Sequence, residues 1–177
     1  MANPRWQRLA LFSFQLAMFA TFVGLIFPRP SSGGADKTLQ PDPWAKAQIM
    51  EPEELARLLS NPGAKKPTIV CVAFEFLYKS AHIPGAQFIG PGRDTKGLEA
   101  LKAWARSIAR DQEVVLYCGC CPLKECPNIR PAFAALRELG LMHLKVLDLE
   151  SSFAKDWVEK DLPIEKREGG NTPNSNH

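Results

Sequence analysis

The sequence lacks the features of a nucleic-acid-binding protein. Its 22 lysines and arginines are nearly balanced by 19 acidic residues, and the formal net charge is only +3. No basic stretch with interleaved aromatic residues occurs, and such a stretch is the usual electrostatic footprint of a nucleic-acid contact. We therefore expect no nucleic-acid partner. An internal repeat is missing as well, and 177 residues suffice for one globular domain but not comfortably for two.

Charge is absent from residues 9–27, a mostly apolar run that follows Arg5 and Arg8. A basic flank before such a run is typical of an export signal or a first transmembrane helix. The run approaches the ~20 residues that span a bilayer, which favours an uncleaved anchor. Small residues at 33–35 offer a cleavage site instead. Residues 1–27 are thus predicted to be a hydrophobic helix, either a membrane anchor or a signal peptide. The domain would then be periplasmic or extracellular if anchored, and secreted if cleaved.

Two further segments have the composition of mobile chain. Residues 28–47 begin Pro-Arg-Pro-Ser-Ser-Gly-Gly and are expected to form a flexible linker. Residues 167–177 hold little that can be buried, so we expect a disordered tail. The globular domain is therefore expected at 48–166.

Within this domain, patterns of buried strands alternate with patterns of amphipathic helices. The runs at 68–74, 114–117 and 144–149 are continuously apolar or nearly so, as in strands buried on both faces of a sheet. Segments whose apolar residues recur at helical spacing lie between these runs and after the last of them. Such alternation predicts an α/β fold with a largely parallel sheet and helices on both faces. The expected helices begin at Pro52 or span Leu98–Ile108, Phe133–Leu139 and Phe153–Lys160.

Four cysteines occur within nine residues at 118–126, directly after the strand at 114–117. Ligand sites of open α/β sheets lie beyond the carboxyl ends of the strands, and Cys118 is at such an end. The loop leads into a helix for which Asn128 is a suitable N-cap. Free backbone N–H groups and the helix dipole favour an anion there, including a thiolate. Because Lys124 and Arg130 add positive charge, we expect the pKa of Cys118 to be lowered and Cys118 to be the nucleophile.

Three ordered motifs resemble those of the rhodanese family. His82-Ile-Pro-Gly-Ala86 follows the first long strand, Tyr117-Cys118 ends the central strand, and Trp157 precedes Leu162-Pro163-Ile164. The resemblance covers about residues 48–166. It implies a mostly parallel five-stranded sheet with helices on both sides.

The same resemblance implies a function and roles for individual residues. Rhodaneses take a sulfane sulfur from a small donor such as thiosulfate, hold it as a cysteine persulfide and pass it to a thiol acceptor, without a cofactor. By position, Cys118 would carry the persulfide, and Arg130 and Lys124 would be candidates for binding the anionic donor. His82, Pro84 and Gly85 would form a structural motif, in which His82 hydrogen-bonds the turn.

The chain departs from the family pattern at the site. Eleven residues separate Cys118 from Arg130, which is longer than the loop of sulfurtransferases or of the related phosphatase branch. Cys71-Val72-Ala73 stands where Asp-Val-Arg is usual, and Ser152-Phe153 stands where a Gly-Gly pair is common. We expect the fold to tolerate these changes.

The cysteine loop therefore keeps several interpretations. Besides sulfur transfer through Cys118, its thiols could exchange with disulfides or hold a soft metal such as copper(I), zinc or an iron–sulfur cluster. They could also form structural disulfides, for example between Cys126 and either Cys120 or Cys121. The alternative function is thus a non-catalytic rhodanese-fold module. Cys71 is either a resolving thiol or a small buried residue of the strand.

Overall fold

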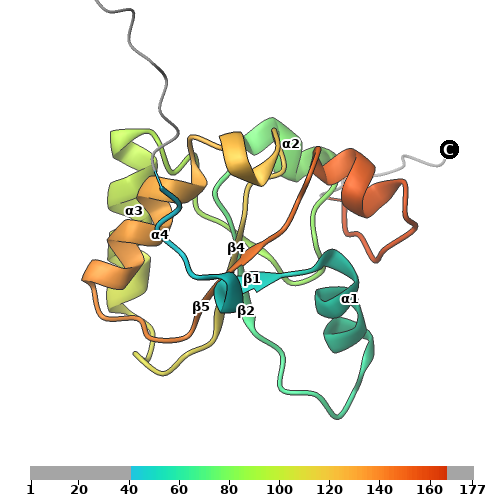
Figure 1. Ribbon diagram of the computed structural model, residues 1–177, viewed down its shortest axis with the longest axis horizontal. Helices are drawn as coiled ribbons and strands as arrows, with labels where there is room; N and C mark the ends of the chain where they lie inside the picture. Colours follow the sequence, from blue (N-terminus) through green and yellow to red (C-terminus); the bar gives the residue numbers. More distant parts are fainter. Residues whose placement is uncertain (1–40, 167–177) are drawn as a thin grey trace, which may run out of the picture. The chain divides into compact units, whose positions relative to one another are not determined.

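The computed structural model describes residues 41–166, which form a five-stranded sheet in the order β1-β5-β4-β2-β3. Every pair of neighbouring strands is parallel. In Figure 1, α3 and α4 lie together on one side of the sheet and α1 lies on the other. The predicted mostly parallel five-stranded sheet with helices on both faces is confirmed. The strands are Ile49–Met50 (β1), Thr68–Cys71 (β2), Gln87–Phe88 (β3), Val114–Tyr117 (β4) and Leu144–Leu147 (β5).

The four α-helices and η2 lie in the segments that connect these strands, whereas η1 precedes β1 and η3 follows β5. Parallel neighbours cannot be joined by a tight turn, so each connection has to pass over a face of the sheet. The α-helices are Pro52–Ser60 (α1), Glu75–Ser80 (α2), Thr95–Arg106 (α3) and Ile129–Glu138 (α4). Two 3-10 turns span Lys46–Gln48 (η1) and Leu123–Glu125 (η2), and a π-helical turn spans Ala154–Val158 (η3).

Two of the inner strands, β2 and β4, end at or directly before a cysteine. All four residues of β4 are buried, as expected for a strand covered on both faces. The last residue of β2, Cys71, is in register with the last residue of β4, Tyr117. The carboxyl ends of the two strands are therefore level, and the segments that follow them begin side by side.

Several element boundaries differ from those predicted. The strand β2 ends at Cys71 rather than at Phe74, and the short helix α2 follows it without having been predicted. The helix α4 begins at Ile129, directly after the predicted N-cap Asn128 and before the apolar pattern at Phe133, because Ile129 and Ala132 share its buried face with Phe133 and Leu136. The earlier start of α4 shortens the cysteine loop at its C-terminal end, while its N-terminal end stays at the predicted end of β4.

The end of the predicted linker packs against the domain. Trp44 is buried and meets the ring of Phe133 edge to face, with the ring centroids 5.7 Å apart. Arg137 on α4 donates a hydrogen bond of 2.9 Å to the carbonyl of Pro43. The domain therefore begins before residue 48, earlier than the composition indicates, because a single tryptophan anchors a segment that otherwise reads as linker.

The predicted hydrophobic helix at 1–27, most of the linker and the tail at 167–177 lie outside the described residues. Within 41–166, no helix has the length and apolarity needed to cross a membrane. The export or anchoring of the chain stays a prediction.

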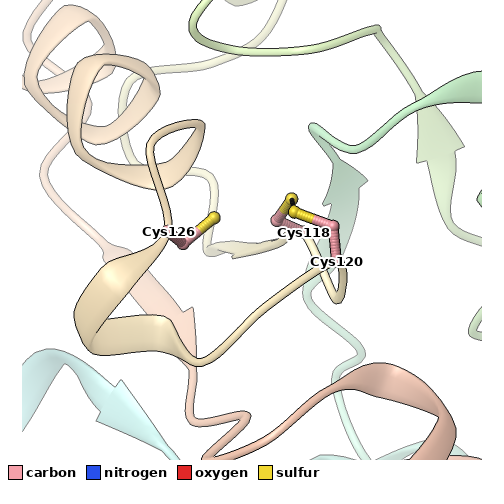
Figure 2. Close-up of side chains that lie close together, drawn as sticks. All are labelled: Cys118, Cys120 and Cys126. Carbon is pink, nitrogen blue, oxygen red and sulfur yellow. Dashed lines mark hydrogen bonds between the residues drawn. The ribbon is translucent and has the colours of Figure 1, made fainter.

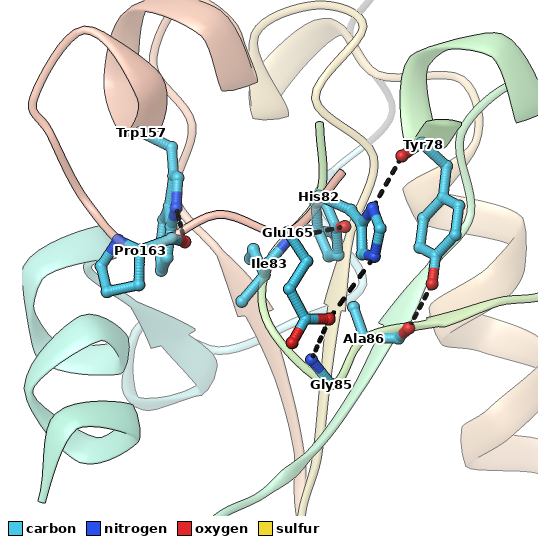
Figure 3. A network of polar contacts seen from close by, with 9 residues as sticks. Tyr78, His82, Ile83, Gly85, Ala86, Trp157, Pro163 and Glu165 are labelled. Atoms are coloured by element: carbon cyan, nitrogen blue, oxygen red, sulfur yellow. Dashed lines mark hydrogen bonds and ion pairs between the residues drawn. The ribbon is translucent and has the colours of Figure 1, made fainter. Parts of the chain in front are cut away.

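Two motifs that are far apart in the sequence are joined by hydrogen bonds (Figure 3). His82 and Glu165 exchange backbone hydrogen bonds of 2.9 and 2.8 Å. The Glu165 carboxylate accepts a bond of 3.2 Å from the Gly85 N–H. Trp157 donates its indole N–H to the carbonyl of Pro163 at 2.8 Å, which fixes the turn between η3 and this contact. Residues 157–165, called the closing segment below, are thereby held against the 82–86 turn.

Replacing Trp157 should be among the most damaging changes in the domain. Its side chain is fully buried and its N–H is satisfied, so Trp157→Ala leaves a large cavity and should lower the free energy of unfolding by about 3–5 kcal/mol. Urea unfolding followed by circular dichroism measures the loss. The exposed Met142 is the control, and Met142→Ala should change stability by less than about 0.5 kcal/mol. Similar effects of the two substitutions would contradict the assigned packing.

Candidate active site

Cys118 is the first residue after β4, and the backbone reverses immediately beyond it. Gly119 has φ +79°, a left-handed conformation that favours glycine. A Cβ atom at this position would lie 2.5 Å from Cβ of Phe153, and the Phe153 N–H bonds the Gly119 carbonyl at 3.1 Å. Only glycine fits this turn, and the turn folds Cys120 back toward Cys118.

The reversal brings the sulfur atoms of the loop into contact. The Sγ atoms of Cys118 and Cys120 are 3.1 Å apart, and those of Cys120 and Cys121 are 3.3 Å apart. Cys126 approaches from across the loop (Figure 2), and the Sγ atoms of Cys118, Cys120 and Cys126 all lie within 4.8 Å of one another. All these cysteines are free thiols. The structure therefore holds a thiol cluster, defined here as Cys118, Cys120, Cys121 and Cys126.

One negative charge is best placed on Cys120. Hydrogen bonds from the thiols of Cys118 and Cys126 lower the pKa of Cys120 far below the ordinary value of a cysteine. The same contacts act oppositely on the donors. The hydrogen bond to Cys120 raises the pKa of Cys118 to about 12, and the bond with Cys118 raises the pKa of Cys126. Burial raises the pKa of Cys121.

The expectation that Cys118 has a lowered pKa is therefore wrong. The Cys118 side chain is 4% exposed and is hydrogen-bonded to a neighbouring sulfur that holds the charge more readily. The prediction that Sγ of Cys118 accepts the transferred sulfur does not depend on this pKa and stays a prediction.

Arg130 and Lys124 do not meet the thiol cluster. The Arg130 guanidinium pairs with the Asp42 carboxylate, donates a bond of 2.8 Å to the Lys124 carbonyl and lies over the ring of Trp44. The Lys124 side chain is exposed on η2. The structure thus places the two predicted anion-binding residues on the outer side of the loop, where Arg130 fastens the start of the domain to α4.

Asn128 is a site residue that the sequence did not reveal. It was expected to cap α4, but its side chain makes no cap hydrogen bond. Its amide N–H₂ instead donates to Sγ of Cys118 at 3.2 Å and lies 3.8 Å from Sγ of Cys120, while its oxygen accepts the Arg93 N–H at 3.2 Å. It is fully buried. Asn128 therefore supplies a fixed donor to the thiol cluster.

Cys118 and Cys120 face a pocket of about 710 Å³ between α2 and the segment around η3. Cys118, Gly119 and Cys120 form part of its lining, and Phe74, Phe76, Tyr117 and Phe153 give it largely aromatic walls. Lys166 is the one charged residue among those that line it within 41–166. The other lining residues are Cys71, Leu77, Tyr78, Ser80, Ala81, Ser152, Ala154, Val158 and Ile164.

The remaining predicted residues, Cys71, His82, Pro84 and Gly85, are not part of the thiol cluster. Cys71 is 1% exposed at the end of β2, and burial raises its pKa to about 11. His82 bonds the Tyr78 carbonyl through Nδ1 at 2.8 Å and faces Glu165 in a separate small pocket. Gly85 has φ +73° in the same turn, which Pro84 precedes. Of these residues, Cys71 lines the pocket that Cys118 and Cys120 face, whereas His82, Pro84 and Gly85 do not.

Comparison with known proteins agrees with the fold. A family model described as "Rhodanese-like domain" matches residues 51–157, and the chain belongs to that family. The solution structure of the rhodanese-like domain of the Alr3790 protein from Anabaena sp. is similar, with 21% identity, a TM-score of 0.51, and coverage of 73% of this chain and 87% of that chain. The crystal structure of the BH2092 protein from Bacillus halodurans is similar too, with 19% identity, a TM-score of 0.52, and coverage of 67% and 77%. No curated protein matches the chain. At these identities, the likeness to the two structures concerns the fold alone.

The charge distribution predicts the order in which the thiols react with an alkylating reagent. At pH ~6 an ordinary cysteine is almost entirely protonated and reacts slowly. The lowered pKa of Cys120 keeps it a thiolate there, and that reactivity is lost only when the pH falls through this lowered pKa. With limiting iodoacetamide, Cys120 should be modified at least ~10 times faster than Cys118. Tandem mass spectrometry of the peptide spanning the loop locates the label.

Cys121 is the matched control for this experiment, because it is partly exposed like Cys120 but has a raised pKa. It should stay unmodified under the same conditions. Preferential labelling of Cys118 or Cys121 would refute the placement of the charge.

Proposed function

We propose that this protein is a sulfurtransferase in which Cys118 carries the sulfur and Cys120 holds the negative charge at rest. The observation that carries the proposal is the contact of 3.1 Å between the two sulfur atoms at a pocket beyond the carboxyl end of β4. This is the edge at which open α/β sheets bind their ligands. Membership of the rhodanese-like domain family supports the same chemistry.

The charge has to move from Cys120 to Cys118 before Cys118 can attack, and this transfer runs against the resting order of the two pKa values, so only a small fraction of the chains carries the charge on Cys118 at any moment. Cys118 donates its S–H to the Cys120 thiolate, and transfer of that proton leaves Cys118 as the thiolate, the nucleophilic form. In this role Cys120 acts as the general base beside the nucleophile. The Cys118 thiolate then attacks the outer sulfur of a donor, the donor's leaving group departs with the bonding electrons, and a Cys118 persulfide results. The Asn128 amide donates to Sγ of Cys118 and stabilises negative charge there.

The walls of the pocket favour an organic sulfur donor over an inorganic dianion. A dianion such as thiosulfate needs positive groups to replace its water, and only Lys166 supplies one among the described lining residues. Aromatic side chains offer apolar contacts instead, and Phe76 is 68% exposed beside the opening. We therefore propose that the donor is an organic thiosulfonate, persulfide or polysulfide.

Two donors that differ only in the group beside the transferred sulfur test this preference. Benzenethiosulfonate has a phenyl ring where thiosulfate has a charged oxygen, and both release a sulfur oxyanion. Because the pocket is apolar, kcat/KM for benzenethiosulfonate should exceed that for thiosulfate by at least ~10-fold, which is about 1.4 kcal/mol of transition-state binding. Transfer to a small thiol acceptor is measured through sulfinate or sulfite release.

Serine at position 118 tests the carrier itself. Cys118→Ser should abolish transfer from both donors, because a hydroxyl cannot form a persulfide. Cys121→Ser removes a neighbouring thiol that does not line the pocket and should keep most of the activity. Full activity in Cys118→Ser would remove Cys118 as the carrier, and a preference for thiosulfate would refute the proposed donor class.

A second candidate function is that of a rhodanese-fold module that binds a soft metal ion. The Sγ atoms of Cys118, Cys120 and Cys126 are separated by between 3.1 Å and 4.8 Å. Three sulfurs around one ion at about 2.3 Å would be about 4 Å apart, which falls within this range. A cavity of about 10 Å³ adjoins Cys118, Cys121 and Cys126 and is otherwise lined by Gly119 and aliphatic side chains. Three thiolates in apolar surroundings suit copper(I) better than zinc, which prefers four ligands.

Copper(I) titration against a competing chelator distinguishes this candidate from sulfur transfer. If the cluster is a metal site, the reduced protein should bind one copper(I) ion, and Cys126→Ser should weaken binding by at least ~10-fold. Equal affinity of the wild-type protein and the Cys126→Ser variant, or no competition with the chelator, would dismiss the metal-binding function.

A further inference from the structure

We propose that Cys120 resolves the persulfide on Cys118, so that the protein releases sulfide and closes a disulfide between the two residues. The inference rests on the proposed sulfur transfer to Cys118. It adds a second step, and with it a different product. A plain sulfurtransferase passes its sulfur to an external acceptor, whereas this centre would reduce the sulfur within the chain.

The geometry of the loop favours this step. The two Sγ atoms are already in contact at 3.1 Å, and a disulfide requires them to close to about 2.05 Å. Gly119 makes the intervening turn, and Phe153 packs where its side chain would be. The turn is thereby held in the form that keeps Cys120 beside Cys118. Such a pre-arranged neighbour reacts as though it were present at very high concentration.

Burial decides which sulfur each thiol can reach. An external acceptor entering the pocket meets the outer sulfur of the persulfide and removes it as sulfane sulfur. The inner sulfur is Sγ of Cys118, whose residue is only 4% exposed, and once the outer sulfur occupies the pocket side of this atom, little of it is left for an external thiol to attack. Cys120 lines the pocket and contacts that sulfur directly. Internal attack on the inner sulfur expels the outer one as hydrosulfide.

The two steps balance in atoms and charge. First, the Cys118 thiolate and a thiosulfonate give the Cys118 persulfide anion and a sulfinate. The proton taken up by Cys120 in forming that thiolate is then used in the second step. The persulfide anion and the Cys120 thiol give a Cys118–Cys120 disulfide and hydrosulfide. The two cysteines are oxidised and the sulfane sulfur is reduced, so each further turnover requires an external dithiol to reduce the disulfide.

Other cysteines of the chain are placed less well for this attack. Cys121 contacts Sγ of Cys120, at 3.3 Å, rather than that of Cys118. Cys71 is buried at the end of a strand. Cys126 belongs to the group of sulfurs that lie within 4.8 Å of one another, which makes it the natural competitor. The assignment to Cys120 is therefore a statement that can be tested against Cys126.

A single turnover of the full, reduced chain with benzenethiosulfonate tests the inference. The reaction is run without oxygen and without any external thiol, and sulfinate, sulfide and intact mass are measured together. Wild-type protein should release one sulfide for each sulfinate and end about 2 Da lighter than the reduced chain, as a disulfide requires. A persulfide would instead add about 32 Da.

Two serine variants assign the resolving thiol. Cys120→Ser should form sulfinate more slowly, because it also lacks the base. Followed to completion, its ratio of sulfide to sulfinate should fall at least ~10-fold, and the persulfide mass should persist. Cys126→Ser has the same number of thiols as Cys120→Ser and should keep the wild-type ratio of sulfide to sulfinate. The ratio does not depend on the rate of the first step.

The outcomes separate the inference from the proposed function. Sulfinate without sulfide in the wild-type protein would overturn the inference and leave the sulfurtransferase standing. Loss of sulfide release in Cys126→Ser, with release intact in Cys120→Ser, would overturn the role of Cys120. A chain that releases no sulfinate from benzenethiosulfonate would overturn the proposed function, and the resolving step would fall with it.

Discussion

The site is governed by the crowding of several thiols around one negative charge at the carboxyl end of β4. Sulfur atoms at 3.1 and 3.3 Å cannot all be charged, because like charges in a poorly solvated cluster repel strongly. One thiolate that accepts hydrogen bonds from its neighbours resolves this conflict, and Cys120 receives the most donors. The proton on Cys118 and the reactivity of the pair both follow from this arrangement.

The rest of the fold keeps that cluster at the edge of an apolar pocket. The in-register ends of β2 and β4 bring Cys71 and Tyr117 side by side. Tyr117 and Phe153 pack against each other, and Phe153 in turn stacks on Trp157. The hydrogen bonds between the 82–86 turn and the closing segment then fix the wall that carries these aromatic rings (Figure 3). Family motifs far from the cysteines thus determine the shape of the site.

The sequence predicted the elements that depend on local patterns and missed those that depend on distant contacts. Continuous apolar runs identified the central strands, and the position of Cys118 followed from the end of β4. The pKa of Cys118 could not be predicted, because it depends on a sulfur contact that Gly119 and Phe153 create together. Arg130 was expected at the substrate, but its partner Asp42 lies 88 residues away and draws it to the other side of the loop. Asn128 is a residue type and position typical of a helix N-cap. Its hydrogen bond to Sγ of Cys118 depends on tertiary packing, which the sequence does not show.

The central claim is that the reduced cluster holds one thiolate, on Cys120, well below the pH at which cysteines ordinarily ionise. Thiolates absorb in the ultraviolet where thiols do not, so titrating this absorbance in the wild-type protein and in Cys120→Ser measures the claim directly. The account predicts about one thiolate per wild-type chain persisting at pH ~6, and its disappearance in the variant. An absorbance that rises only above pH ~8 in the wild-type protein, as for independent cysteines, would contradict it.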